Sequence, residues 1–291
     1  MAILRRLLNA SLLSLLLASC ATSDREILEP FSWRVPWKVG DRIEIVRVEE
    51  TQLTRAALDL KTDGVIPSEF GWKSRLVFHA TVTGTNQDSL QLDLWVASAR
   101  IEAKGGNETT TNVYERGKGQ RDVETGEVVE TAKAFERPYR CTVNQSGIMT
   151  DWEHRLDATA CLHGLGGEYY NVFTSVLLKL PLTSVSWGHS WQTKTAVTIA
   201  HCDQVPFVLA CVLERGASAS QQDGYSIGAK AFLDESAAEH LGSIGAQIGS
   251  GRWWISPDRR RVEGRFVLDL AKDGKRMLLW RDEVLVAPLR N

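Results

Sequence analysis

The chain has 291 residues, and its 34 basic and 36 acidic side chains nearly cancel, to a net charge of −2. This balance gives no overall positive field, so composition excludes a general nucleic-acid-binding protein. The one dense basic run, Arg259–Arg261, follows Ser256-Pro-Asp258 and is predicted to lie at a hairpin tip. With 43% hydrophobic residues, the chain can bury a sizeable core in one large or two small domains.

The N-terminus has the pattern of a secretory signal. Arg5-Arg6 precede an apolar run from Leu7 to Leu17, and the small residues Ala18 and Ser19 follow. This run is far shorter than the roughly 20 apolar residues that a membrane-spanning helix needs. We therefore predict a signal peptide over residues 1–19.

The last residues of this run, Leu17-Ala18-Ser19-Cys20, resemble the lipobox of bacterial lipoproteins. The resemblance implies cleavage before Cys20 and attachment of diacylglycerol to its thiol. Several acyl chains on one residue anchor a protein stably, because each buried CH₂ contributes about 0.8 kcal/mol. Ala21 stands where many inner-membrane lipoproteins have Asp, which favours the periplasmic side of the outer membrane. The alternative is an ordinary signal peptide with a cysteine near the cut.

Residues 20–36 contain charges, two prolines and few periodic apolar positions, so we predict a tether between the membrane and the folded part. An N-terminal β lobe is expected over residues 37–160. Its strands are indicated by alternating apolar residues at 42–49 and by hairpin patterns at 75–97 and 139–152. The polar, glycine-rich stretch 105–126 is predicted to form a long loop or an edge hairpin.

The second half begins with a predicted amphipathic helix. Within 168–180, apolar residues recur at three- and four-residue steps, and Pro181 ends the pattern. A shorter helix is predicted at 235–241. Further strands are expected at residues 192–202, 207–213, 245–255, 262–270 and 277–286. The predicted fold class is mainly β: antiparallel meanders in two related lobes, half-barrel or sandwich-like, with the central helix opening a C-terminal lobe over 161–291.

A short internal repeat favours the two related lobes. Pro36-Trp37-Lys-Val-Gly40-Asp41 precedes a strand in the first half, and Trp187-Gly188-His189-Ser-Trp191 precedes one in the second. Three stretches resemble a group of secreted bacterial β-proteins of unknown function: Lys38-Val-Gly-Asp41, Val143-Asn-Gln-Ser-Gly147-Ile148 and Leu180-Pro-Leu-Thr-Ser-Val-Ser-Trp-Gly-His-Ser-Trp191. His189 stands where that group usually has Asp. The resemblance implies an exported β fold and no particular activity.

Four cysteines lie beyond the lipobox, and an even number in an exported chain favours two disulfides. Cys202–Cys211 is preferred, because a turn at 203–206 would place these two residues opposite each other in a hairpin. Cys141–Cys161 then follows by elimination. Four cysteines allow three connectivities in all, so the pairing stays open at this point.

No catalytic constellation is recognised in the sequence. The serine-hydrolase pattern Gly-x-Ser-x-Gly and the glycine patterns that bind phosphate are absent. The residues Cys161, His163, His201 and Cys202 could supply zinc ligands, but they lack the usual ligand spacing, and an oxidising compartment favours disulfides. We therefore predict no catalytic residue, no metal site and no cofactor.

The ten tryptophans are many for this length, and most are expected to anchor the core. Trp253 and Trp254 are adjacent in a predicted strand, so they face opposite sides, and they are weak candidates for ligand binding. The leading hypothesis is a non-enzymatic envelope lipoprotein. It would be held at the membrane through its lipidated N-terminus and would bind a lipid or another apolar ligand.

Two alternatives stay open. A scaffold or interaction protein of the cell envelope would bind another envelope protein, with the loop at 105–126 as the expected contact. A hydrolase of a cell-wall or extracellular polymer would need two carboxylates placed across a cleft, which the sequence alone does not reveal.

Overall fold

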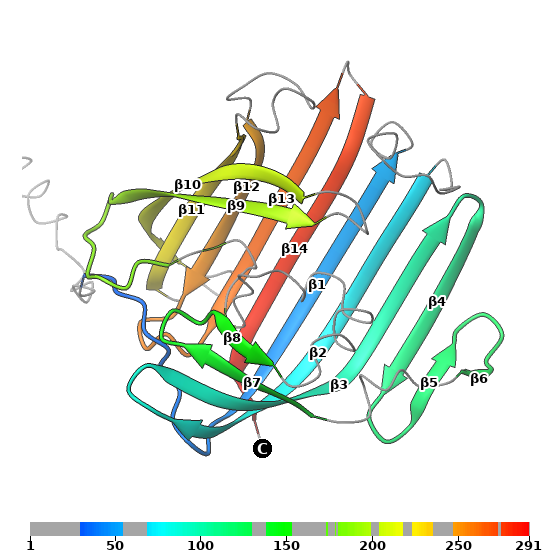
Figure 1. Cartoon of the computed structure of the whole chain (residues 1–291), viewed down its shortest axis with the longest axis horizontal. Helices are drawn as coiled ribbons and strands as arrows, with labels where there is room; N and C mark the ends of the chain where they lie inside the picture. The colour runs from blue at the N-terminus through cyan, green and yellow to red at the C-terminus, as the bar shows by residue number, and fades with distance from the viewer. Residues whose placement is uncertain are drawn as a thin grey trace, which may run out of the picture.

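The computed structural model describes residues 30–54, 69–129, 138–152, 173, 178, 180–198, 204–217, 223–234, 247–272 and 275–290. These residues form one antiparallel sheet of 14 strands and contain no helix (Figure 1). The prediction of a mainly β, antiparallel fold is therefore confirmed. A helix long and apolar enough to cross a membrane is not found in this part of the chain.

The strands follow one another as hairpins along most of the chain. The first half contains β1 (Arg42–Thr54), β2 (Glu69–Thr85), β3 (Ser89–Gly105), β4 (Glu108–Glu115), β5 (Gly119–Asp122), β6 (Val128–Val129), β7 (Tyr139–Asn144) and β8 (Met149–Trp152). The second half contains β9 (Ser190–Thr198), β10 (Gln204–Ala217), β11 (Asp223–Leu233), β12 (Gln247–Ile255), β13 (Val262–Lys272) and β14 (Lys275–Pro288). Their order across the sheet is β6-β5-β4-β3-β2-β1-β14-β13-β12-β11-β10-β9, and β7 joins β3 and carries β8.

The two halves of the chain share this sheet, so the structure does not support the predicted two lobes. The first strand pairs with the last, from Ile43 opposite Pro288 to Leu53 opposite Leu278. Hydrogen bonding therefore runs without a break from one half to the other.

The predicted central helix is not supported either. Phe173, Leu178 and Leu180 are not helical, and the other residues of 168–180 lie outside the described part. The same holds for all of the shorter predicted helix at 235–241. A periodic apolar pattern alone does not force a helix when its residues can instead fill a sheet core.

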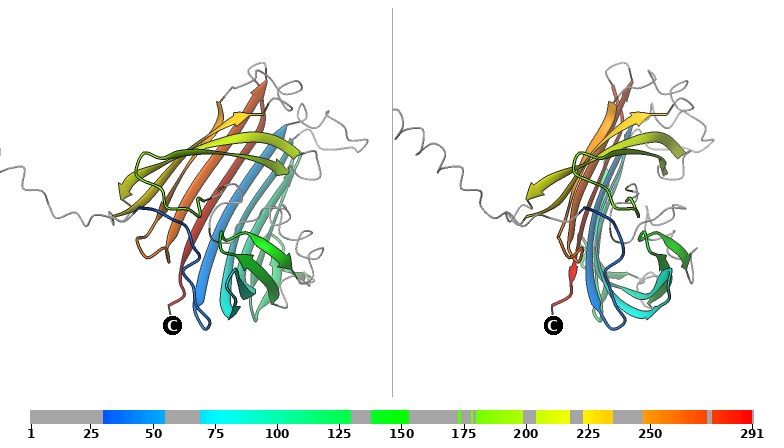
Figure 2. Two further views of the ribbon diagram at one scale, coloured as in Figure 1. Left: turned by 60° about the vertical axis from the view of Figure 1, so that its left-hand side comes forward. Right: turned by 90° about the vertical axis from the view of Figure 1, so that its left-hand side faces the viewer.

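The sheet is curved, and β7 and β8, which branch off β3, lie on the same side of its long strands as β9 and β10 (Figure 2). The long strand β3 changes partner along its length. Ser89–Leu94 pairs with β7, whereas Ser98–Gly105 pairs with β4. A break of register between Val77 and Phe78 marks a bulge in the β2–β3 pairing, and bulges allow strands to bend. The inner side of the curve is called the concave face below.

The hydrophobic core lies on the concave face. In β1, Ile43 and Ile45 are buried, whereas Glu44 between them is only partly covered. This alternation is what a strand with one packed face requires. The same alternation in β14 buries Val284 and Val286 on the core side.

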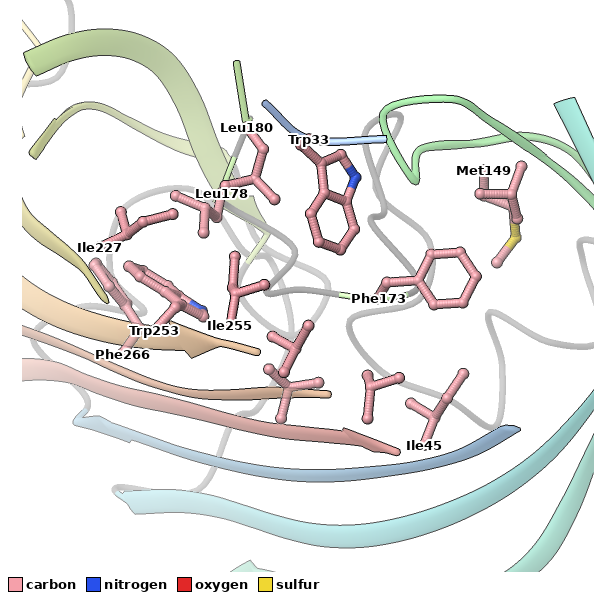
Figure 3. Close-up of a cluster of buried hydrophobic side chains, with 14 of the residues drawn as sticks. Trp33, Ile45, Met149, Phe173, Leu178, Leu180, Ile227, Trp253, Ile255 and Phe266 are labelled. Atoms are coloured by element: carbon pink, nitrogen blue, oxygen red, sulfur yellow. The ribbon is translucent and has the colours of Figure 1, made fainter. Parts of the chain in front are cut away.

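Segments without regular structure cover part of this face. Phe31 and Val185 join two of them through a pair of backbone hydrogen bonds of 2.9 and 2.7 Å. Figure 3 shows Trp33 and Phe173 across the core from the sheet residue Ile45. Phe31 and Trp33 are 0% exposed, so the end of the predicted tether belongs to the folded body.

The two stretches of the internal repeat form equivalent turns. Gly40 has φ of 89° and donates its N–H to the carbonyl of Val82 in β2 at 2.9 Å. Gly188 has φ of 78° and donates its N–H to the carbonyl of Leu213 in β10 at 2.8 Å. Each turn leads into the strand that pairs with its acceptor strand. Positive φ at the third residue of a turn favours glycine.

Most predicted strands are present, and several are longer than expected. The stretch 105–126, predicted as a loop or an edge hairpin, contains β4 and β5 near one edge of the sheet. The sequence reading missed β11 altogether. The turn predicted at Ser256-Pro-Asp258 joins β12 to β13, and Ser256 closes it by accepting the N–H of Arg259 at 2.8 Å.

Candidate functional site

A row of aromatic rings crosses the concave face from strand to strand. We define this aromatic row by Phe207 of β10, Trp253 of β12, Phe266 of β13 and Trp280 of β14. Phe266 is its centre, because its ring centroid lies 6.4 Å from Phe207, 6.0 Å from Trp253 and 6.0 Å from Trp280. All four side chains are buried. Aromatic pairs at these separations stabilise a core beyond their buried area.

Glycines make room for the aromatic row. Gly264 lies opposite Trp253 in the β12–β13 ladder, and a Cβ built on it would meet the indole ring. Gly251 lies opposite Phe266, and a Cβ there would come within 2.6 Å of the ring carbon Cδ2. The rings therefore lie flat against neighbouring backbone, which a side chain at either glycine would prevent.

An ion pair lies at the end of the aromatic row. Arg47 of β1 donates from Nη2 to Oδ1 of Asp282 in β14 at 2.6 Å, and the side chains are only 7% and 1% exposed. Both alternate with core residues, so both face the concave side. Burying two charges has a desolvation cost that close contact and further hydrogen bonds must offset. The pair is thus a polar feature in an otherwise apolar face.

Glu49 is the third charged residue of this cluster, and it lies directly opposite Asp282 in the ladder. Its Oε1 accepts a hydrogen bond from Nε1 of Trp280 at 3.0 Å. Burial raises the pKa of the Glu49 carboxyl from 4.5 to about 7. The Trp280 hydrogen bond and the charge of Arg47 lower this pKa, while the charge of Asp282 raises it. Burial outweighs both lowering effects.

Partly exposed apolar side chains surround Glu49. Ser74 of β2 lies opposite Glu49 and opposite Ile101 of β3, which places all three on one face. Trp72 and Phe70 continue along β2 on the same face, at alternate positions. Ile101, Trp72 and Phe70 are only partly buried, as is Glu49 itself. We call Glu49, Phe70, Trp72, Ile101 and Trp280 the Glu49 patch, and it is the candidate functional site.

The convex face has a different character. Its charged side chains pair across strands, for example Arg281 with Glu50 at 2.9 Å and Arg252 with Glu214 at 3.3 Å. A groove of about 540 Å³ crosses β10–β13 on this side, lined by Ala210, Val212, Glu214, Gly228, Ala229, Lys230, Ser250, Gly251, Arg252, Arg265 and Val267. Side chains of both charge signs line this groove, so it favours no single charge of ligand. The convex face is suited to contact with water.

The two candidate tryptophans lie on opposite faces, as the strand alternation predicts. Trp253 is 0% exposed and belongs to the aromatic row. Trp254 is 5% exposed and lies on the convex side against Gly224, where a Cβ would meet its Nε1. Ligand binding by either residue stays a prediction. The partly exposed tryptophan of the candidate site is Trp72, which sequence reasoning did not single out.

The hairpin register that led to the Cys202–Cys211 disulfide is wrong. Cys211 pairs with Trp191, and β9 and β10 meet near Thr198 and Gln204, several residues before the predicted turn centre. Pro206 lies inside β10 and not in a turn. A strand can hold a proline near its start, where the missing N–H is tolerated. The prediction placed the turn at Pro206, and this is why the register was wrong.

The two described cysteines do not support the predicted disulfides. Cys141 and Cys211 are free, buried thiols, whereas Cys161 and Cys202 lie outside the described residues, as does Cys20. Burial raises the pKa of both described thiols to about 12. A thiol with so high a pKa is a poor nucleophile and a poor metal ligand at neutral pH. A metal-binding group of three or more His, Cys, Asp or Glu is not found among the described residues.

Glu49 and Asp282 are two adjacent carboxyl groups, the arrangement that an acid–base hydrolase would need. Asp282 is 1% exposed and is held by Arg47. A polymer chain could not reach its oxygens without displacing the core. The described geometry therefore gives the hydrolase alternative little support.

Comparison with known proteins gives no family. No protein-family model matches the chain, and no curated protein matches its sequence. The resemblance to secreted bacterial β-proteins of unknown function therefore stays a prediction.

Two solved structures are distantly similar. One, of lipid–protein interactions in lipovitellin, is 7% identical with a TM-score of 0.31 and covers 87% of this chain and 25% of that one. The chain thus spans about a quarter of the lipovitellin chain. The other, an outer membrane channel from Pseudomonas putida F1, is 7% identical with a TM-score of 0.24 and covers 90% of this chain and 99% of that one. Similarity at this level carries no argument about this chain.

Proposed function

We propose that this chain is a non-enzymatic lipoprotein of the cell envelope that binds a lipid or another apolar ligand on the concave face of its sheet. The supporting observation is the Glu49 patch. Phe70, Trp72 and Ile101 offer apolar surface that is still partly exposed, on the face where the rest of the sheet is packed. Apolar residues gathered on one accessible face are the type of surface that lines ligand-binding grooves.

The proposed location in the cell envelope rests on the N-terminal leader. Arg5-Arg6, the apolar run and the lipobox ending at Cys20 would export the chain and attach acyl groups to it. The favoured location is the periplasmic side of the outer membrane. Mass spectrometry of the protein extracted from its own membranes tests this part. We expect a mature chain that begins at an acylated Cys20, and an uncleaved, unmodified N-terminus would contradict it.

Ligand binding is tested separately by native mass spectrometry of the full chain. The protein is purified in a detergent, transferred to a volatile buffer, and measured before and after addition of a lipid extract. We expect discrete adducts of lipid mass in stoichiometric amount. A matched variant, Trp72→Glu, places a charge in the Glu49 patch and should remove the adducts. Absence of adducts from the parent protein, or equal adducts on the variant, would refute binding at this site.

A further inference from the structure

We propose that the ligand is an amphiphile whose polar end is a hydrogen-bond donor, an amine or a hydroxyl group, and that the carboxyl group of Glu49 holds this end. The inference rests on the function proposed above and names the chemical class of its ligand. An amphiphile of this class would place its alkyl chain against the apolar members of the Glu49 patch. Four observations support this assignment.

The first observation is position. Glu49 lies between Ser74 on one neighbouring strand and Asp282 on the other, so it is at the centre of the polar part of the concave face. Two residues further along β1, Thr51 lies between Trp72 and Trp280. The Glu49 carboxyl therefore contacts the indole of Trp280 and lies on the same face as Trp72. A ligand that covers both kinds of surface must have a polar end and an apolar body.

The second observation is the hydrogen bonding of the carboxyl group. Oε1 accepts from Trp280, and no further hydrogen bond from a described residue reaches Oε2. The neighbouring cation Arg47 directs Nη2 to Asp282. A carboxylate that is partly withdrawn from water and lacks a second donor is costly. A donor on the ligand would supply the missing hydrogen bond.

The third observation is the charge around Glu49. Among the described residues, the groups that face it are Arg47 on its own strand and Asp282 on β14, while β2 contributes Ser74 and Trp72, which do not titrate in this range. Arg47 and Asp282 carry opposite charges and are in contact at 2.6 Å, so they largely offset each other, and Glu49 adds a second carboxylate when it is ionised. An anionic headgroup, such as a carboxylate or a phosphate, would meet like charge here.

The fourth observation is that Glu49 and the apolar members of the patch share the same accessibility. Glu49, Phe70, Trp72 and Ile101 are all partly exposed, whereas their neighbours Arg47 and Asp282 on the same face are buried. A ligand that approaches the concave face would therefore meet the Glu49 carboxyl before the ion pair. This ordering assigns the headgroup contact to Glu49.

Calorimetric titration of the full chain with three amphiphiles of equal length tests the proposal: dodecylamine and dodecanoate, each below its micelle concentration, and dodecanol below its solubility limit. At pH 8 we expect the amine to bind most tightly and the dodecanoate to bind least. Glu49→Gln should weaken the amine at least about tenfold, because a hydrogen bond to an ionised group is lost. The same substitution should change dodecanol by only about two- to threefold. Glu50→Gln is the matched control on the convex face of the same strand, and it should leave all three affinities unchanged.

The pH gives a second readout. A carboxyl with a pKa of about 7 is mostly ionised at pH 8 and mostly protonated at pH 6. The affinity for the amine should therefore fall about tenfold between these values in the parent chain, and should not fall in Glu49→Gln.

The outcomes separate the two proposals. If all three amphiphiles bind equally, or if Glu49→Gln leaves the amine unchanged, the assignment to Glu49 is overturned and ligand binding on the concave face stands. Tightest binding of dodecanoate would also overturn the assignment. If none of the three binds, both the assignment and the proposed function fail.

Discussion

Trp253 of β12 lies flat against Gly264 of β13, in the place that a side chain at residue 264 would occupy. The indole is 0% exposed and stacks on Phe266. A small residue on one strand thus makes room for the largest residue on the next. The absence of a side chain at Gly264 therefore allows the close packing of the aromatic row, so this glycine contributes to the core.

Gly264→Ala should destabilise the protein by about 2–3 kcal/mol, because a buried ring and its neighbours must move to admit one methyl group. Urea unfolding followed by tryptophan fluorescence measures the change. Gly228→Ala is the control, since a Cβ there meets its nearest atoms at 3.6 Å, an ordinary contact. Equal losses for the two variants would show that Trp253 does not pack as described.

Asp282→Ala should cost about 3–5 kcal/mol, because it leaves the buried guanidinium of Arg47 without this carboxylate. The double variant Arg47→Met with Asp282→Leu should recover most of that loss, since apolar residues of similar volume fit a core well. Chemical denaturation of the two variants and the parent gives the comparison. A single variant that loses less than about 1 kcal/mol would mean that the pair is open to water.

The raised pKa of Glu49 predicts a pH-dependent stability. The carboxyl ionises near pH 4.5 in the unfolded chain and near pH 7 in the folded one. Its stabilising contribution is therefore complete below pH 4.5 and is lost as the pH rises through about 7. Glu49→Gln has no carboxyl to titrate at this position. The free energy of unfolding of the variant minus that of the parent should therefore increase by about 1–3 kcal/mol from pH 5 to pH 8. A constant difference between the two proteins over this range would contradict the pKa.

The equivalent turns at Gly40 and Gly188 predict equal costs. Both residues have positive φ and no atom within 4 Å of a built Cβ, so only backbone strain opposes a side chain. Gly40→Ala and Gly188→Ala should each destabilise the protein by about 1 kcal/mol. Thermal unfolding of both variants measures this. If the losses of stability in Gly40→Ala and Gly188→Ala differ by more than about 1 kcal/mol, the full expected loss, the two turns are not equivalent.

Much of the sheet could be predicted from the sequence, because strands with one buried face alternate apolar and polar residues. The strand from Arg42 and the hairpin of β2 and β3 were found in this way. β11 was missed, since Gly224, Gly228, Ala229 and Ala231 blur the alternation. Two of these residues are small for reasons that lie on neighbouring strands: Gly224 makes room for Trp254, and Ala231 is packed in the core. A local pattern does not contain that information.

The candidate site could not be predicted, for a reason of distance along the chain. Trp280 and Glu49 are separated by 231 positions, and they meet only because the last strand pairs with the first. Nothing in either segment specifies its partner, because many strands have suitable alternation. In the sequence Val48-Glu49-Glu50, no local feature distinguishes Glu49 from a surface carboxylate. The lipobox-like stretch ending at Cys20, in contrast, is a local pattern that needs no fold to be noticed, and lipidation at Cys20 stays a prediction.

The central claim is that the concave face, at the Glu49 patch, is where the ligand binds. Photocrosslinking with a long-chain alcohol that carries a diazirine near the middle of its chain tests it most directly, with the labelled residues located by tandem mass spectrometry. The account predicts labels on Phe70, Trp72 and Ile101 that unlabelled alcohol competes away. Labels confined to convex-face residues such as Val46 and Leu285, or spread without competition, would contradict it.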